Sequence, residues 1–279
     1  MLELGKMNRL KAVSKTEHGM YLAESDPAEE KVLLPRKYTD GQMNVGDMTE
    51  VFLYKDSSDR LIATTVKPKI MLHEVALLRV KDVGKIGAFV DWGLEKDLLL
   101  PFREQTKTVH AGEEVLVALY VDKTGRLALT MNVYEYLRTD SPYQKDDTVN
   151  ARVYLISRNF GAFVAVDDQY SALIPKKELF VDLTVGETVT CRVAKKEEDG
   201  KLTLSIRQKS YEQMDDDAEA IVQKIRGYGG KLPFNDKAAP EVIKREFSMS
   251  KAQFKRAVGR LYKERRIEIT DASIILKES

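Results

Sequence analysis

The chain has 279 residues, of which 32% are charged and 43% hydrophobic, and its formal net charge is only +1. These values exclude a disordered chain, and they exclude attraction of nucleic acid by overall charge, so any such attraction has to come from local patches. The first residues, MLELGKMNRLK, hold no apolar run of signal-peptide length, and no window approaches the about 18 apolar residues of a membrane span. We therefore expect a cytoplasmic protein with no membrane partner.

Four landmarks recur three times along the chain. They are a glycine–small–aromatic–aliphatic run (19–22, 87–90, 161–164), two aliphatics before a proline (33–35, 99–101, 173–175), a glycine before an acid (46–47, 112–113, 186–187) and a basic residue before leucine (60–61, 126–127, 201–202). The prolines precede the second glycines by 11 residues in every copy, and 15, 15 and 16 residues separate those glycines from the leucines. Such constant spacing indicates duplication. It predicts repeats at 1–68, 69–140 and 141–211, followed by a separate domain at 212–279.

Each repeat consists of short β-patterned runs separated by turns. In the third repeat the runs are VNARVYLI, GAFVAV, SALIP, TVTCRVAKKE and KLTLSIR. Five strands in so short a unit, without a long amphipathic helix, are typical of a closed barrel of the OB type. Closure also removes exposed sheet edges. The fold class predicted for the chain is therefore multidomain and mainly β, with three tandem five-stranded barrels.

The tail after residue 212 has helical periodicity instead. EAIVQKIRGYGG reads as a helix that stops at paired glycines, and APEVIKREF reads as a second helix with Pro240 in its first turn. SKAQFKRAVGRLYKERR predicts a third helix with Ser250 as its N-cap, and IEITDASIIL predicts two strands around a turn at residues 271–272. Three helices followed by a β-hairpin are the order of a winged-helix domain.

The repeated aromatic residue is predicted to point out of each barrel. Side chains alternate along a strand, so Ala162, Val164 and Val166 share the inner face and Phe163 occupies the outer one. The same register places Phe89 and Tyr21 on the outside of the other barrels. One explanation is a nucleic-acid surface; the alternative is that a neighbouring domain or a long loop covers these rings.

The third repeat carries the strongest candidate site. Gly161 permits a bulge or a positive φ, so Phe160 can lie on the same surface as Phe163 and form a stacking platform for unpaired bases. The basic residues expected to contact phosphates around the platform are Arg158, Lys176, Lys201 and Arg207. Weaker RNA-binding candidates in the first two repeats are Tyr21, Phe89 and Arg126.

A second basic surface is predicted on the third tail helix. Its apolar residues cluster on one face at helical spacing, while residues 250–266 hold seven basic side chains against one acid. Those proposed to bind RNA are Lys255, Arg256, Arg260, Lys263, Arg265 and Arg266. Lysine and arginine suit phosphate contact better than base readout. This favours cooperation with the third barrel on RNA over binding to operator DNA, and a solvated helix surface is the simpler alternative.

No motif in the sequence indicates catalysis. The three histidines are widely spaced, and neither a phosphate-binding glycine loop nor a nucleophile elbow is present. Cys191 is the only cysteine, which excludes an internal disulfide and a multi-cysteine metal site. We expect no enzyme, no cofactor and no metal.

The repeats resemble the S1-type RNA-binding domain of ribosomal protein S1. The third repeat matches its pattern through FGAFV (160–164) and LSIR (204–207). The second keeps GAFV, Asp122 and Arg126 but has Ile86 in place of the first aromatic, and the first has His18 and Tyr21 in the two aromatic positions. All three have proline where many members of the family carry histidine after the third strand.

The whole chain resembles the conserved virulence factor B (YitL-like) family of Gram-positive bacteria. The segment LPFNDKAAPEVIKREFSMSKAQFKRAVGRLYKERRI carries this resemblance beyond the S1-type domains. The resemblance implies a non-catalytic RNA-binding protein that influences expression of virulence genes. The leading hypothesis is a post-transcriptional regulator that binds single-stranded RNA through the third barrel and the winged helix. The alternatives are a transcription regulator that binds duplex DNA through the winged helix, and a protein-interaction scaffold.

Overall fold

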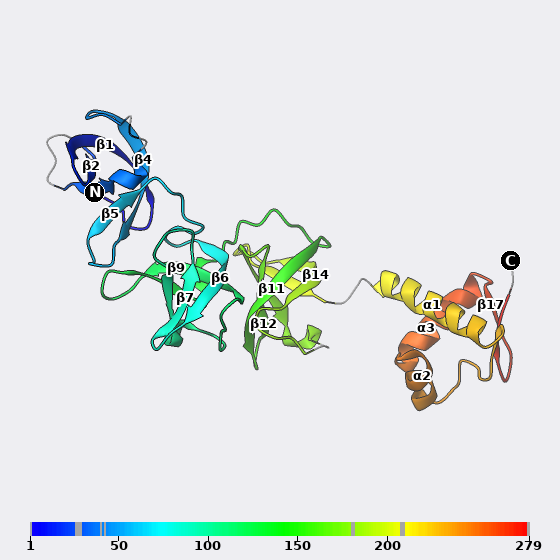
Figure 1. Ribbon diagram of the computed structural model, residues 1–279. Helices are drawn as coiled ribbons and strands as arrows, with labels where there is room; N and C mark the ends of the chain where they lie inside the picture. Colours follow the sequence, from blue (N-terminus) through cyan, green and yellow to red (C-terminus); the bar gives the residue numbers. More distant parts are fainter. Residues whose placement is uncertain are drawn as a thin grey trace. The chain divides into compact units, whose positions relative to one another are not determined.

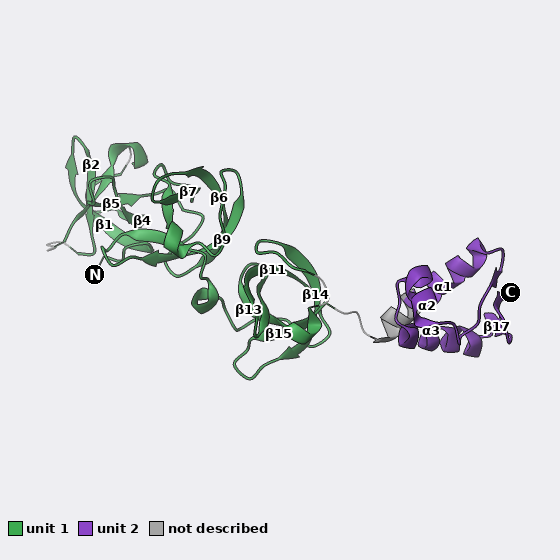
Figure 2. Ribbon diagram, turned by 90° about the horizontal axis from the view of Figure 1, so that it is seen from below, with its two compact units in different colours: residues 1–206 green, residues 207–279 purple. Residues whose placement is uncertain are grey.

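The structure is a computed structural model. It describes residues 2–25, 30–39, 41, 43–179, 182–206 and 210–277, with side chains in the first α-helix from Asp217 onward. The chain forms two compact units, Met1–Ile206 and Arg207–Ser279, which are coloured separately in Figure 2. Each unit is described by itself below.

The first unit contains three five-stranded barrels of the OB type, as predicted (Figure 1). The first barrel comprises β1 (Met7–Thr16), β2 (Gly19–Ala23), β3 (Val32–Pro35), β4 (Met48–Lys55) and β5 (Leu61–Thr64). The second comprises β6 (Val75–Val83), β7 (Gly87–Asp91), β8 (Leu98–Pro101), β9 (Glu114–Val121) and β10 (Leu127–Thr130). The third comprises β11 (Thr148–Ser157), β12 (Gly161–Val166), β13 (Tyr170–Pro175), β14 (Thr188–Lys196) and β15 (Leu202–Ser205).

The three barrels share one order of neighbouring strands, but only the first and third are closed by hydrogen bonds; in the second, β8 and β10 form no described ladder. The third runs β11-β12-β13-β15-β14, and a short parallel pairing of β13 with β15 closes it. The first strand of each barrel carries a register shift against its neighbour at the same place, between Ala12 and Ser14, Val80 and Asp82, and Val153 and Leu155. A bulge bends the strand and increases its twist, which helps so small a sheet to curl into a barrel.

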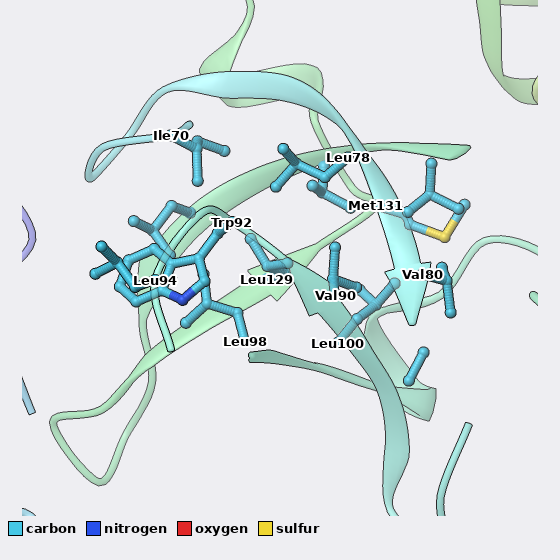
Figure 3. Close-up of a cluster of buried hydrophobic side chains, with 14 of the residues drawn as sticks. Ile70, Leu78, Val80, Val90, Trp92, Leu94, Leu98, Leu100, Leu129 and Met131 are labelled. Carbon is cyan, nitrogen blue, oxygen red and sulfur yellow. The ribbon is translucent and has the colours of Figure 1, made fainter. Parts of the chain in front are cut away.

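The inner faces of the strands form the cores. In the second barrel, Val90 and Leu100 face Leu129 across the interior, and Trp92 lies at one end of this cluster (Figure 3). The same cluster includes Phe52 and Tyr54 from β4 of the first barrel. The first barrel keeps a separate core around Leu10, Leu22 and Leu53, so Phe52 and Tyr54 lie on its outer side and extend the core of the second barrel.

The second unit has the predicted winged-helix order. It contains α1 (Ser210–Gly227), β16 (Lys231–Leu232), α2 (Pro240–Phe247), α3 (Lys251–Lys263), β17 (Ile267–Ile269) and β18 (Ile274–Leu276). Pro240 begins α2, and the Ser250 hydroxyl caps α3 by accepting from the N–H of Gln253. Within the described ranges, no helix is long and apolar enough to cross a membrane.

Two features of this unit differ from the sequence expectation. Helix α1 begins at Ser210, well before the EAIV run, because the polar segment SYEQMDDD has no apolar periodicity to mark it. The sheet has three strands in the order β16-β18-β17, since Lys231 and Leu232 pair with β18. A two-residue strand is too short to produce a periodic pattern.

Candidate nucleic-acid interface

Strand β12 separates its side chains as the alternation predicts. Ala162, Val164 and Val166 are fully buried in the core of the third barrel, and Phe163 is half-buried on the outer face. The other two barrels repeat the arrangement, with Ala88 and Val90 inside and Phe89 on the outer side of β7. The outward register of the repeated aromatic residue is therefore present in the fold.

Gly161 allows the tight turn that leads into β12. Its φ is +122°, and a Cβ at this position would lie 2.1 Å from the carbonyl oxygen of Ile174. The turn before it is held by Ser157, whose hydroxyl accepts from the N–H groups of Asn159 and Phe160. Only glycine fits here without distortion, because every other residue carries a Cβ.

Phe160 and Phe163 lie together on the outer surface of the third barrel. Their ring centroids are 6.3 Å apart with an interplanar angle of 69°, and Phe160 is 63% exposed. Large aromatic side chains lose favourable burial when they stay in water, so an exposed ring beside a second ring indicates a binding surface.

A third ring, Tyr134, extends this surface. It belongs to η3 (Tyr134–Tyr136), a turn of 3₁₀-helix in the segment between the second and third barrels. Its ring meets Phe163 edge to face with centroids 5.8 Å apart, and its side chain is 39% exposed. The sequence pattern missed Tyr134 because it lies outside the four recurring landmarks, near the end of the second predicted repeat; the only hint is the pair of tyrosines in VYEY.

The other side of Phe163 packs against the contact between the second and third barrels. Tyr154 of β11 lies 6.4 Å from it between centroids, and Tyr154 and Ala165 are buried against Leu116 and Ala118 of β9. Burial raises the pKa of the Tyr154 hydroxyl, which keeps it protonated. The aromatic surface thus rests on a neighbouring domain on one side and stays open on the other.

The predicted basic residues around the rings have different environments. Arg158 and Lys176 are exposed, and neither forms an ion pair with a described residue. Lys201 is bound to Asp199 at 2.9 Å, and its ammonium lies 5.3 Å from the centroid of the Tyr134 ring. The bonds to Asp199 and then Tyr134 raise the pKa of Lys201, so it stays charged. Arg207 lies outside the described residues.

A hollow of about 420 Å³ opens beside the rings. Tyr134 and Phe163 line it together with Ser171 and Leu173 of β13, and the β14–β15 hairpin supplies its charged residues. Those residues are Lys195, Glu197, Glu198, Asp199 and Lys201.

The corresponding surface of the second barrel is enclosed. Phe89 and Arg126 line a smaller hollow of about 230 Å³ whose other wall is the β4–β5 hairpin of the first barrel, including Tyr54. Arg126 forms an ion pair with Asp59 of that hairpin. In the first barrel, Tyr21 is half-buried, and no described aromatic ring stacks on it. The three weaker candidates therefore do not form one surface with Phe160 and Phe163.

The basic residues of α3 separate into two groups. Lys255, Arg256 and Lys263 are exposed and form no ion pair within the part of the chain that the structure describes, and Arg265 just beyond the helix is exposed as well. Arg260 bonds to Glu264 at 2.7 Å, and Arg266 bonds to Glu219 of α1 at 2.8 Å. The opposite face of α3 buries Phe254 and Leu261 in the core of the unit.

Comparison with known domains defines the class of protein. The S1 domain matches residues 4–66 and 74–132, the S1 RNA binding domain matches 143–207, and the CvfB-like winged helix domain matches 219–276. These are families of nucleic-acid-binding domains and not of enzymes, so the chain is a nucleic-acid-binding protein with three S1 domains and a winged helix.

Proteins that are similar over most of the chain show which family within this class the chain belongs to. Conserved virulence factor B of Staphylococcus aureus strain N315 is 32% identical over 248 residues, which cover 85% of this chain and 82% of that protein, and the protein of strain MW2 gives the same figures. A solved multidomain protein with nucleic acid binding domains from Streptococcus pneumoniae is 25% identical, with 98% of each chain covered and a TM-score of 0.48. The chain belongs to the conserved virulence factor B family.

Proposed function

We propose that this protein is a cytoplasmic post-transcriptional regulator of gene expression, including virulence genes, that binds single-stranded RNA. Unpaired bases stack on Phe160 and Phe163 of the third barrel, while Arg158 and Lys176 contact the phosphates beside them. The exposed cations of α3 hold a further part of the RNA backbone.

One observation carries the proposal: Phe160 is 63% exposed and lies against a second aromatic ring, Phe163. Phe163 is the outward aromatic residue of the third S1 domain, at the position that all three S1 domains of the chain share. A ring exposed to that extent contributes little to folding. Bases of any sequence stack on aromatic rings, at about 1–3 kcal/mol per base. Single strands present such faces freely, whereas a duplex hides them within its own stack.

The main test uses Phe160→Ala, because Phe163 is partly buried and its truncation would also disturb folding. Fluorescence anisotropy should give a weaker Kd for single-stranded RNA, by a factor of about 5 to 150, as expected from the loss of one stacked base. Phe102→Ala is the matched control, since Phe102 is 51% exposed but lies on η2 (Phe102–Glu104) of the second barrel. Equal affinity of the wild type and Phe160→Ala would contradict the proposed surface.

The second test concerns the cations of α3. The double variant Lys255→Gln, Arg256→Gln should bind RNA more weakly and lower the slope of log Kd against log salt concentration by about 1.4, because fewer counterions are released. The control is Lys231→Gln, Lys237→Gln, which removes two exposed cations of the same unit outside α3. An unchanged slope in the α3 variant would place the RNA elsewhere.

Duplex DNA is the competing ligand, because a winged helix presents its third helix to a groove in many transcription regulators. Titration of the wild type with a duplex of the same length at two salt concentrations distinguishes the two. Tighter binding to the duplex, with no effect of Phe160→Ala, would favour a transcription regulator. Binding of neither nucleic acid would favour a protein-interaction scaffold.

A further inference from the structure

The hollow beside Phe163 has the dimensions and walls of a ligand pocket. Its volume of about 420 Å³ falls in the range of roughly 300–1,000 Å³ that small-molecule sites occupy. Tyr134 and Phe163 meet at an interplanar angle of 86°, so they form a corner and not a slot. A flat aromatic ligand can stack on one ring while its edge meets the other.

The floor of the hollow holds a polar group that no described residue satisfies. Ser171 is 3% exposed and lines the hollow, and its hydroxyl makes no hydrogen bond with any described residue. Its backbone N–H donates to the carbonyl of Arg138. The hydroxyl is reached from the hollow and is free of described protein partners, so a ligand in the hollow can exchange a hydrogen bond with it.

The open side of the hollow carries a net negative charge. Lys195 pairs with Glu197, and Lys201 pairs with Asp199, which leaves Glu198 as an exposed carboxylate without an ion pair to a described residue. The bonds from Lys195 and Thr203 lower the pKa of Glu197, and those from Lys201 lower the pKa of Asp199. Two lysines against three carboxylates disfavour a phosphate inside the hollow and favour a ligand that donates hydrogen bonds.

We propose that this hollow is a base-specific pocket that takes one unpaired guanine of the bound RNA. The inference rests on the proposed function, because it assigns the base that the RNA places beside Phe163. Guanine stacks in the corner of Tyr134 and Phe163. Its Watson–Crick edge offers the O6 acceptor to Ser171, and it offers adjacent N1–H and N2–H₂ donors to the carboxylate of Glu198.

The other bases fit this arrangement less well. Uracil has a single N–H donor flanked by two carbonyl acceptors, and adenine and cytosine each have one amino group beside an unprotonated ring nitrogen. Only guanine presents two neighbouring donors to one carboxylate. Tyr134 and Glu198 thus act as specificity-determining residues, while Phe160 supplies stacking that tolerates any base.

The test compares RNA oligomers of about nine uridines, a length within the usual site size of one OB fold. The central base is uracil, guanine, adenine or cytosine. Wild-type protein should bind the guanine oligomer about tenfold more tightly than all-uridine, as one bidentate pair allows, and should bind the adenine and cytosine oligomers nearly like all-uridine. Equal binding of all four oligomers would overturn the guanine pocket.

Two variants assign the preference to this hollow. Glu198→Gln should remove most of the guanine advantage and leave binding of all-uridine unchanged or slightly tighter, because it removes a negative charge without changing shape. Ser171→Ala should reduce the same advantage. Glu114→Gln is the matched control: Glu114 is exposed on β9 and does not line this hollow, so the guanine preference should persist. If Glu198→Gln kept the full preference for the guanine oligomer, the assignment of that preference to this hollow would be refuted.

The outcomes separate this inference from the proposed function. If Phe160→Ala weakens binding of all-uridine RNA but the central base makes no difference to the affinity, the proposed RNA binding stands and the guanine pocket is rejected. Failure of every oligomer to bind rejects both. A guanine preference that is lost in Tyr134→Leu and Glu198→Gln, but kept in Glu114→Gln, supports both.

Discussion

Gly161→Ala is expected to destabilise the third barrel by about 3–4 kcal/mol, a large effect for one methyl group. The cause is backbone geometry. Gly161 has a φ of +122°, and its Cβ would lie 2.1 Å from the carbonyl oxygen of Ile174 and 2.6 Å from the backbone nitrogen of Lys176. Either β12 or β13 has to move, and the ladder that joins Gly161 to Pro175 would be lost.

Hydrogen exchange measured by mass spectrometry on the intact chain locates this effect. Peptides from β11 to β15 should exchange faster in Gly161→Ala, and the midpoint of urea unfolding for this barrel should fall. Gly227→Ala is the control, because no atom lies within 4 Å of a Cβ at that position, at the end of α1. If hydrogen exchange throughout the third barrel were as slow in Gly161→Ala as in the wild type, the start of β12 would tolerate a side chain and the prediction would be wrong.

Trp92→Ala is expected to cost about 3–5 kcal/mol and to destabilise two barrels at once. Trp92 is 2% exposed, and its ring packs edge to face on Phe52 at 5.6 Å and on Tyr54 at 6.2 Å between centroids. Its indole N–H also donates to the carbonyl of Lys96 at 2.6 Å. Truncation leaves a cavity between the two barrels and exposes the rings from β4.

The prediction is tested by the same exchange measurement. Peptides from β4 and β5 of the first barrel should lose protection together with those from β6 to β10. Phe254→Ala is the matched control: it removes a fully buried ring from the winged-helix unit and should leave both barrels protected. Loss of protection confined to the second barrel of Trp92→Ala would mean that the first barrel folds independently of it.

The sequence predicted what depends on local pattern. Alternation along GAFVAV assigned the inner and outer faces of β12, and the glycine before it indicated the unusual backbone that Gly161 adopts. Serine and proline signals located the starts of α3 and α2. These inferences held because strand alternation, helix capping and the Cβ clash act over a few residues.

The sequence could not show which neighbour each surface meets. Tyr134 joins Phe163, Asp59 pairs with Arg126, and Glu219 pairs with Arg266, yet each pair is far apart along the chain. No periodicity encodes such contacts, because they depend on how whole elements pack. For the same reason, the unpartnered hydroxyl of Ser171 looked like any polar residue in a strand.

The sequence alone therefore determined three similar barrels, a winged helix and an outward aromatic residue on each barrel. The sequence also ranked the third position above the other two, but only the tertiary structure decided what lies against each ring. The first barrel encloses the surface of Phe89, whereas the segment between the second and third barrels adds Tyr134 to that of Phe163. Duplication copies the local pattern of a repeat, but exposure depends on what the rest of the chain packs against it.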